Sequence, residues 1–468
     1  MLPSSWPWTS GPHWVTFWCG VRSAPVLVLG ACVATSLIFP VAAVPLGREP
    51  QMRVLLQESP RLSLRADGNR FLQVHGLPGG TQQLRRLSLQ LEAGRLMVEL
   101  DGRRRSLPIS SELRVTNQDP RGIWLGPRRY RGVLNLSSAA GRLRAINHLG
   151  IESYLPSVVG SEMPHQWPLA ALQAQSVAAR TYALRKRNRG GLWDVKATVS
   201  SQVYKGVESE TPSTLKAVSS TRSLVLVHGG KLINAVFHSS SGGATEASGM
   251  VWQQQLPYLV SVPDHDQHSP MHRWQQRFDP VGLRQRLPET GGVDAVQVLS
   301  RSSSGRVRQA RLQGPRGSLM LTGADLRSRL GLKSTLVEFE MVPAVSTTAP
   351  VNPALVTTTP SAAFPVTPRG SSSRIQQLTA SLVAAPPPLR RRAQFRPSVG
   401  GLQLLVRGQG YGHGVGMSQW GAHGLAQRGA DFRSILRHYY RGADVMPYRP
   451  FHDPTLAQAS PSGPRWRG

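Results

Sequence analysis

Residues 161–184 read SEMPHQWPLAALQAQSVAARTYAL, and this stretch decides the fold of the region around it. After Pro168, small and apolar residues recur at helical spacing, which predicts a helix over residues 169–184. Pro168 suits the start of a helix, where its missing N–H leaves no hydrogen bond unmade. Because nearly every side chain of this helix is small, we expect other parts of the backbone to approach it closely.

Two charged residues stand out in this stretch, Glu162 and Arg180. Glu162 lies among apolar neighbours, and a carboxyl group in such surroundings is hard to ionise and can donate a proton near neutral pH. The alternative is that Glu162 caps the helix or interacts with its dipole. Arg180 lies in the middle of an alanine-rich helix and needs a partner nearby; it shares one polar stripe with Gln173 and Ser176.

The composition leaves the partner class open. The chain has 468 residues, enough for two or more domains. Its 55 Lys and Arg residues against 25 Asp and Glu residues give a net charge of +30. Such a charge favours nucleic acid, anionic lipid or cell-wall polymer alike. No nucleic-acid-binding motif accompanies it, so we expect no specific nucleic-acid partner.

The N-terminal segment, residues 1–47, is predicted to be a signal peptide or a membrane anchor. An apolar run without charges covers residues 23–47, and residues 41–43 (VAA) offer a small-residue cleavage site. The run is also long enough to span a bilayer, and residues 29–32 (LGAC) resemble a lipoprotein box. Both cysteines of the chain lie in this segment, so the exported part has no disulfide or thiolate site. We expect an exported protein of the periplasm or cell envelope, with membrane contact only through this segment.

Changes in composition predict the remaining domain boundaries. Residues 48–129 alternate apolar and polar side chains between turn signals, which predicts a β-rich N-terminal module. Residues 130–342 and 398–446 are predicted to be two parts of one domain. Between them, residues 343–397 are rich in Pro, Thr and Ala and are expected to form a disordered insertion. Residues 447–468 are expected to be a disordered tail.

Glycine occupies alternate positions over residues 408–416. A nucleotide-binding fingerprint would need glycine where His413 stands, so the phosphate-loop interpretation fails. Bare backbone with aromatic and polar side chains beside it suits a groove that a polymer approaches closely, with aromatic faces against sugar rings. The side chains meant are Tyr411, His413, Gln419 and Trp420. A tight structural loop is the alternative.

Acidic and histidine side chains crowd into one short stretch, which contains Asp264, His265, Asp266, His268 and His272. These residue types ligate metals, but Pro270 interrupts any regular helix between the last two. A solvated polar loop is the alternative, and we predict no metal site.

Several blocks of the sequence, in order, resemble the SpoIID/LytB family, which contains the stage II sporulation protein D and the amidase enhancer LytB. Two of them are FHSSSGGATE at 237–246 and GYGHGVGMSQWGA at 410–422. The others lie at 151–164, 167–182, 201–206, 251–259 and 435–442.

The resemblance implies a lytic transglycosylase that cleaves peptidoglycan glycan strands between MurNAc and GlcNAc to 1,6-anhydro products, with no cofactor. Glu162 matches the catalytic acid/base of the family. Arg180 matches a position expected to matter for activity, and we assign it to orienting Glu162 or gripping the glycan. Substrate contacts are expected from Gln173, Gln202, Tyr204, His238, Ser241, Tyr411, His413, Gln419 and Trp420. For the fold we expect α+β, a mixed and largely antiparallel sheet with the alanine-rich helix beside a glycan groove.

Three alternatives stay open. A second carboxylate facing Glu162 would make hydrolysis credible; the candidates are Glu152, which we expect to be structural, Asp194, Glu208 and Glu246. A LytB-type role would make the protein a non-catalytic, glycan-binding enhancer of a cell-wall amidase. A polyanion-binding surface protein would have no enzymatic role.

Some SpoIID proteins carry zinc through Cys and His near the His238 position, but this chain has serines there.

Overall fold

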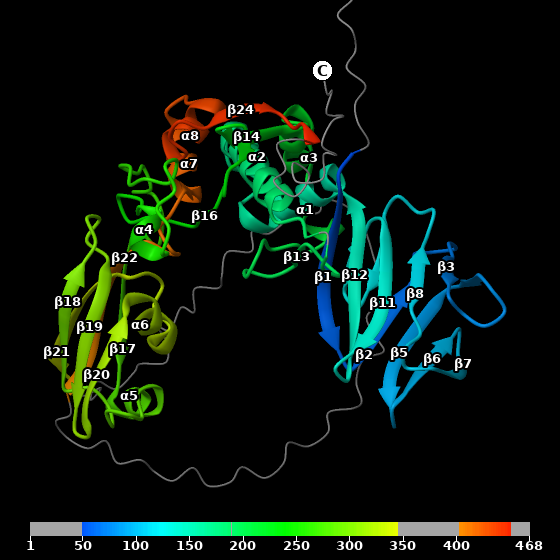
Figure 1. The fold of residues 1–468 in the computed structure, drawn as a ribbon, viewed down its shortest axis with the longest axis horizontal. Helices are drawn as coiled ribbons and strands as arrows, with labels where there is room; N and C mark the ends of the chain where they lie inside the picture. Colours follow the sequence, from blue (N-terminus) through cyan, green and yellow to red (C-terminus); the bar gives the residue numbers. More distant parts are fainter. Residues whose placement is uncertain (1–48, 189, 345–401, 451–468) are drawn as a thin grey trace, which may run out of the picture. The chain divides into compact units, whose positions relative to one another are not determined.

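The first of two large sheets contains strands from the N-terminal region (Figure 1). The structure is a computed structural model, and it describes residues 49–188, 190–344 and 402–450. This sheet has the strand order β13-β1-β12-β11-β8-β3-β4, and only the β1–β13 pair is parallel. Its strands are β1 (Gln51–Ser59), β3 (Leu72–His75), β4 (Gln82–Leu84), β8 (Leu113–Thr116), β11 (Val133–Ala139), β12 (Arg142–Gly150) and β13 (Val195–Lys196).

The second large sheet is antiparallel throughout and has the order β10-β9-β2-β5-β6-β7. Buried Leu62 and Leu64 alternate with exposed neighbours and pair with Leu89 and Leu87 of the next strand. One face of this sheet is therefore apolar and the other polar, as the sequence pattern predicts. The strands are β2 (Arg61–Arg65), β5 (Arg86–Glu92), β6 (Arg95–Leu100), β7 (Arg103–Leu107), β9 (Ile123–Leu125) and β10 (Arg128–Tyr130).

Two helices follow β12 directly, α1 (Ile151–Glu162) and α2 (Leu169–Arg185). Helix α2 agrees with the helix expected over residues 169–184. Nearly all of its small side chains are buried, and α1, α3, α7 and α8 all pack against it. Gly160 serves the same purpose in α1: a Cβ atom there would lie 1.9 Å from the Ser209 carbonyl oxygen.

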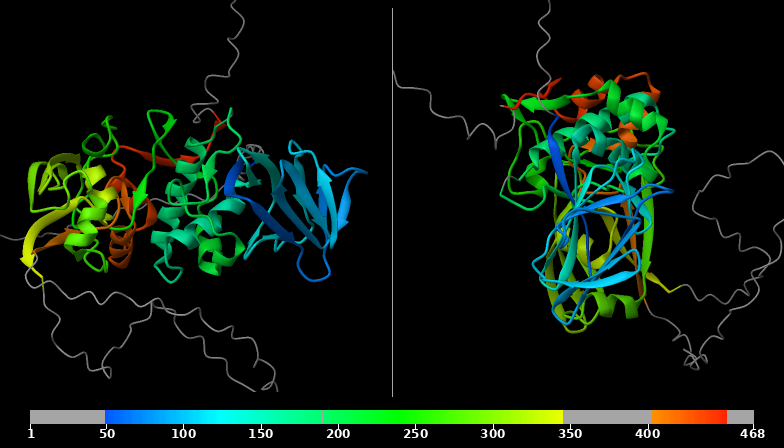
Figure 2. Two further views of the ribbon diagram at one scale, coloured as in Figure 1. Left: turned by 90° about the horizontal axis from the view of Figure 1, so that it is seen from below. Right: turned by 90° about the vertical axis from the view of Figure 1, so that its right-hand side faces the viewer.

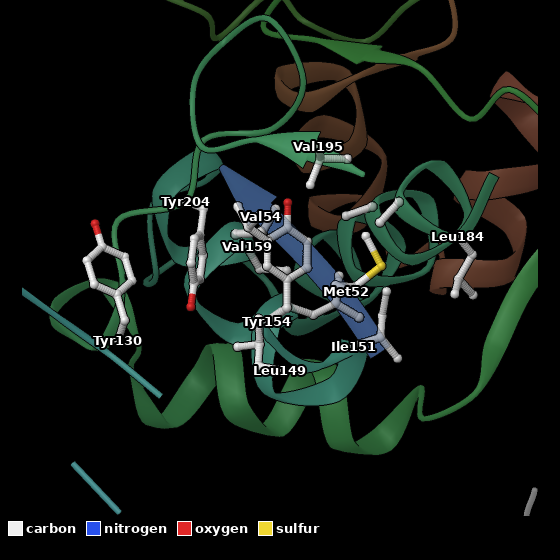
Figure 3. Close-up of a cluster of buried hydrophobic side chains, with 14 of the residues drawn as sticks. Met52, Val54, Tyr130, Leu149, Ile151, Tyr154, Val159, Leu184, Val195 and Tyr204 are labelled. Carbon is white, nitrogen blue, oxygen red and sulfur yellow. The ribbon is translucent and has the colours of Figure 1, made fainter. Parts of the chain in front are cut away.

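One hydrophobic core joins the N-terminal strands to these helices. Figure 3 shows Met52 and Val54 of β1 beside Tyr154 of α1 and the ring of Tyr204. The Tyr154 and Tyr204 ring centroids lie 5.0 Å apart. The β-rich region expected as an added module thus shares its core with α1 and α2.

The same hydrophobic core also includes residues from two further segments, one between residues 204 and 262 and one between residues 415 and 443. Strand β14 pairs with β15 and with β24, and β16 pairs in parallel with β23. The strands are β14 (Leu224–His228), β15 (Lys231–Leu232), β16 (Phe237–His238), β23 (Met417–Ser418) and β24 (Asp444–Pro447). The helices are η1 (Val207–Ser209), α3 (Pro212–Ser220), α4 (Ser248–Val251), α7 (Gln419–Gln427) and α8 (Phe432–Tyr439).

A second hydrophobic core, which the sequence did not reveal, lies among strands β17–β22 and helices α5 and α6. Strand β22 pairs with both β17 and β21, and in Figure 2 the orange strand β22 lies beside the green and yellow strands. A separate three-stranded sheet has the order β18-β19-β20. The elements are β17 (Arg273–Phe278), α5 (Pro280–Arg286), β18 (Ala295–Arg301), β19 (Val307–Gly314), β20 (Gly317–Thr322), α6 (Gly323–Leu330), β21 (Leu336–Pro343) and β22 (Leu402–Gln409).

The predicted α+β class is confirmed, with mixed and largely antiparallel sheets and a β-rich N-terminal region. The leader at 1–47 lies outside the described residues. So do the insertion predicted at 343–397, apart from its first two residues, and the tail predicted at 447–468, apart from its first four. No helix of the described part of the chain is long and apolar enough to cross a membrane.

Candidate active site

Glu162 is the last residue of helix α1, and its carboxylate meets two distant segments. Oε1 accepts a hydrogen bond from the backbone N–H of Val203 at 2.8 Å. Oε2 accepts one from the side-chain amide of Gln419 at 3.3 Å. Three parts of the chain therefore converge on one half-buried carboxyl group, including Gln419, which lies 257 residues away along the sequence.

The surroundings of Glu162 favour its protonated form. Burial raises the pKa of the carboxyl group above its ordinary value, because a charged carboxylate loses hydration there. The hydrogen bonds from Val203 and Gln419 and the charge of Lys205 act in the opposite direction. Burial is the largest effect, so the group keeps its proton to a higher pH than a solvated Glu, in agreement with its apolar neighbours in the sequence.

The segment that presents the Val203 N–H is fixed by its two buried neighbours. Gln202 accepts a hydrogen bond from the Tyr154 hydroxyl at 3.2 Å and donates one to the carbonyl of Ala179 at 3.2 Å. Tyr204 donates its hydroxyl proton to Asn147 at 2.9 Å. Both side chains are buried and their polar groups are bonded within the protein, and the substrate contact expected of them stays a prediction. They hold the Val203 donor in place, and a backbone donor leaves no mark in a sequence.

The glycine ladder, residues 408–416, positions Gln419. Gly416 has φ +73°, and a Cβ atom there would lie 2.1 Å from the Val236 carbonyl oxygen. This close approach accompanies the parallel pairing of β16 with β23, the strand directly before Gln419. The Ser418 side chain then accepts the Gly421 N–H at 3.1 Å and caps helix α7. The tight structural loop considered as an alternative is therefore present in this part of the ladder.

Aromatic side chains lie close in sequence to Glu162 and to Gln419, the two residues joined by a hydrogen bond. Trp167, in the loop after Glu162, meets Trp420 edge-on with ring centroids 4.7 Å apart. His423 lies 4.6 Å from Trp167 and 5.5 Å from Trp420, again between ring centroids. Trp167 and Trp420 are each half-buried. Trp420 was expected here, whereas Trp167 was missed as a site residue although it belongs to the stretch that the sequence singled out.

Arg180 has a different place from the one expected. Its side chain is fully buried and forms a two-point ion pair with Glu152, at 2.9 and 2.8 Å. It also donates to the carbonyls of Leu224 at 3.1 Å and Val218 at 3.3 Å. These bonds occupy the guanidinium, because a buried charge needs a partner and α2 supplies none. The structure thus gives Arg180 a structural ion pair, with no hydrogen bond to Glu162, and agrees with the structural role expected of Glu152; a part for Arg180 at the glycan stays a prediction.

His238 and Ser241 are buried as well. The Nδ1 atom of His238 lies 3.1 Å from the Val415 carbonyl oxygen, and burial lowers the pKa of its imidazole. Ser241 donates its hydroxyl proton to Asp264. Asp266 accepts the backbone N–H groups of Gly242 and Gly243 at 2.7 and 3.0 Å.

The stretch considered for a metal thus contributes two carboxylates that hold the loop 240–243. Asp264 also accepts the Tyr439 hydroxyl proton at 2.5 Å, and His272 Nδ1 lies 3.1 Å from Asp266. Among the described residues, no group of three or more His, Cys, Asp or Glu side chains is arranged to hold a metal ion.

The remaining predicted contacts lie elsewhere. Gln173 donates to the hydroxyl of Ser220 at 2.9 Å. Tyr411 is 47% exposed, and with His413 it lines a cavity that does not include Glu162. The structure therefore brings Gln419 and Trp420 to Glu162 and its loop, and gives the other seven residues different surroundings.

Each candidate for a second carboxylate has a partner of its own. Glu152 pairs with Arg180, Asp194 with Arg53 at 2.8 Å, and Glu208 with Arg129 at 2.7 Å. Glu246 accepts hydrogen bonds from the hydroxyls of Ser302 and Ser304. Glu162, in contrast to these four carboxylates, forms no ion pair and accepts no hydroxyl hydrogen bond within the described part of the chain; its partners are the Val203 N–H and the Gln419 amide.

Comparison with known proteins agrees with the resemblance seen in the sequence. Residues 139–228, which include Glu162 and Arg180, match the SpoIID family, described as stage II sporulation protein. An uncharacterized protein of Brachyspira hyodysenteriae is 29% identical over 330 residues, covering 70% of this chain and 75% of the relative. The stage II sporulation protein D of Bacillus amyloliquefaciens is 28% identical over 323 residues, covering 64% of this chain and 75% of the relative.

An amidase enhancer of Bacillus subtilis is 31% identical over 310 residues, which cover 63% of this chain. The match spans only 40% of that longer protein. The family match over residues 139–228 and these relatives together support the resemblance of this chain to the SpoIID/LytB domain family.

Proposed function

We propose that the protein is an exported lytic transglycosylase that cleaves peptidoglycan glycan strands, with Glu162 as the single acid/base. The observation that carries this proposal is the half-buried Glu162 carboxyl, whose pKa is raised by burial and which meets Val203 and Gln419. The stage II sporulation proteins among its relatives support a role at the cell wall.

Protonated Glu162 would give its proton to the glycosidic oxygen between MurNAc and GlcNAc as that bond breaks. The resulting carboxylate would then accept the proton of the sugar's own C6 hydroxyl as this hydroxyl attacks C1. The product carries a 1,6-anhydro ring, and the attacking group is already part of the substrate, so proximity supplies much of the rate advantage. This chemistry needs one carboxylate, whereas ordinary glycoside hydrolysis needs two.

The two contacts of Glu162 suit both halves of this cycle. The Val203 N–H donates to Oε1 and stabilises the carboxylate that forms after proton transfer. The Gln419 amide has a donor end and an acceptor end. By turning over, it can donate to the Oε2 of the carboxylate or accept from the protonated acid. Trp167 and Trp420 would stack against sugar rings beside the bond that breaks.

The test is a digestion of peptide-free glycan strands by the full chain, with products identified by mass. We expect 1,6-anhydro ends from the wild type and none from Glu162→Gln. The matched control is Glu208→Gln, which removes a carboxylate paired with Arg129 and should leave cleavage intact. Reducing ends in place of anhydro ends would contradict the single-carboxylate mechanism, and equal cleavage by Glu162→Gln would remove Glu162 from it.

The second candidate is a non-catalytic, glycan-binding enhancer of a cell-wall amidase. It is favoured by the amidase enhancer among the relatives. Adding the protein to a cell-wall amidase and measuring release of stem peptides would test it. Stimulation that is equal for wild type and Glu162→Gln, without any anhydro product, would support the enhancer and contradict the transglycosylase.

A further inference from the structure

A large cavity of about 1650 Å³ lies beside the part of the glycine ladder that precedes Gln419. Its walls come from α4 and the residues after it, from the β18–β19 turn, from α6, and from Tyr411 and His413. Glu162 does not line it, and the proposed chemistry does not use it. Its side chains nevertheless have the composition of a binding site.

The cavity carries excess positive charge. Four cationic side chains line it, Arg306, Arg308, Arg327 and Lys333, against one carboxylate, Glu246. Glu246 is already engaged by two serine hydroxyls and by the N–H of Ala247 at 3.0 Å. Within the described ranges, none of the four cations forms an ion pair with a carboxylate. The charges of Arg308, Arg327 and Lys333 therefore remain available to an anion that enters, whereas the charge of Arg306 is partly balanced by the carboxylates of Glu246, Asp266 and Asp264.

Arg306 is the most unusual of the four, because it is only 2% exposed. Its Nη2 donates to the Ser241 carbonyl at 2.6 Å, but Nε and Nη1 have no hydrogen-bond partner among the described residues. The guanidinium lies against bare backbone: a Cβ atom on Gly414 would come 2.6 Å from Arg306 Cζ. Burying a charged group with unmatched donors is costly, and the nearby charges of Glu246, Asp266 and Asp264 offset part of that cost.

Exposed aromatic faces accompany these charges. Trp252 is 39% exposed and Tyr411 is 47% exposed, and both line the cavity. The His413 ring lies 5.4 Å from that of Trp252 between centroids. Burial, together with the charges of Arg327 and Arg306, lowers the pKa of His413 to about 4, so His413 is neutral near pH 7. Flat rings beside guanidinium groups suit a ligand that has both ring faces and negative charges.

We propose that this cavity binds an acidic oligosaccharide, with Arg327 and Lys333 contacting its carboxylates and Trp252 and Tyr411 its sugar rings. The inference deepens the proposed function, on which it rests. A glycan strand freed of peptide exposes the lactyl carboxylate of each MurNAc, so the same strand that Glu162 cuts would be held here by its charge. Arg306 lies behind the contact surface, where it donates to the Ser241 carbonyl and is partly balanced by nearby carboxylates, so it is not one of the groups that contact the anion.

The test measures binding by calorimetry with the full-length Glu162→Gln variant, which leaves the glycan uncut. The probes are a peptide-free glycan oligosaccharide and the same oligosaccharide with its carboxylates converted to neutral amides. We expect the acidic probe to bind at least about tenfold more tightly than the amidated one. Adding Arg327→Gln and Lys333→Gln should remove that difference.

The matched control adds Arg284→Gln and Arg311→Gln, which remove two exposed cations outside the cavity and should keep the difference. Equal affinity for the two probes, or the same loss in the control pair as in the cavity pair, would overturn the proposal. Cleavage by the wild type is scored separately. Charge-dependent binding without cleavage would defeat the proposed function alone, and cleavage with cavity variants that bind normally would defeat this inference alone.

Discussion

At the scale of single residues, Gln419 is the side chain that adjusts the acid. Its amide donates to the charged form of Glu162 and so lowers the pKa that burial raises. Replacing it in Gln419→Leu should raise that pKa further, so that Glu162 stays protonated at higher pH. Because the reaction starts from the protonated acid, the descending limb of the plot of kcat/KM against pH should move to higher pH.

The measurement is that pH profile for glycan cleavage, compared with wild type and with Gln297→Leu. Gln297 is an exposed amide on β18, and its loss should leave the limb in place. A limb that stays fixed or moves to lower pH in Gln419→Leu would mean that the amide does not act on the proton of Glu162.

Arg180 is a residue whose importance lies in stability. Its removal would leave the largely buried Glu152 without its cation, and breaking a buried pair costs about 3–5 kcal/mol of unfolding free energy. We expect Arg180→Met to lose about that much in urea unfolding. The double variant with Glu152→Leu should lose less unfolding free energy than the two single variants added together. Both single variants break the same ion pair, which the double variant breaks only once. Lost cleavage with unchanged stability would instead favour a direct role for Arg180 at the glycan.

At the scale of elements, the glycine ladder works through close backbone approach. Gly416 and Gly429 both have positive φ, +73° and +88°, so an Ala at either position adds about 1–2 kcal/mol of strain. Only at Gly416 would the new Cβ also strike backbone, the Val236 carbonyl. Gly416→Ala should therefore lose about 1–3 kcal/mol more than Gly429→Ala in urea unfolding. Equal losses of unfolding free energy in the two variants would show that the close approach of Gly416 to the Val236 carbonyl is not required for stability.

Patterns within one element were predictable from the sequence. Helix α2 followed from Pro168 and the spacing of small residues, and the raised pKa of Glu162 from its apolar neighbours. The hydrogen-bond partners of these residues were not predictable, because each partner lies far away along the sequence. Gln419 was named for its place in the ladder, but its bond to Glu162 depends on β16 pairing with β23.

The differences between the sequence-based predictions and the structure have the same origin. Gln202 and Tyr204 are polar residues in a block that resembles the family, so they were assigned to substrate. In the structure Gln202 is hydrogen-bonded to Tyr154 and Ala179, and Tyr204 to Asn147. The second core was missed because β22 joins it from beyond residue 401. A sequence indicates which groups need partners, but topology decides which partners they meet.

At the scale of the whole molecule, the net charge of +30 and the local chemistry of Glu162 should respond differently to salt. Attraction between this chain and an anionic wall acts over distance and is screened. The Debye length falls from about 10 Å at about 0.1 M salt to about 3 Å at about 1 M. The contacts of Glu162 are hydrogen bonds at 2.8 and 3.3 Å in half-buried surroundings, where salt screens little.

Cleavage of intact, anionic wall material should therefore slow steeply between these two salt concentrations. Cleavage of a short glycan oligosaccharide whose carboxylates have been converted to neutral amides should change little. Salt weakens only capture by long-range charge, and this neutral substrate is not captured in that way. The ratio of the two initial rates is the measurement, and it isolates capture from chemistry since the same acid cuts both substrates. An equal decline for both would place the salt sensitivity at Glu162 or in the fold around it, and the positive charge of the chain would then have no part in bringing the protein to the wall material.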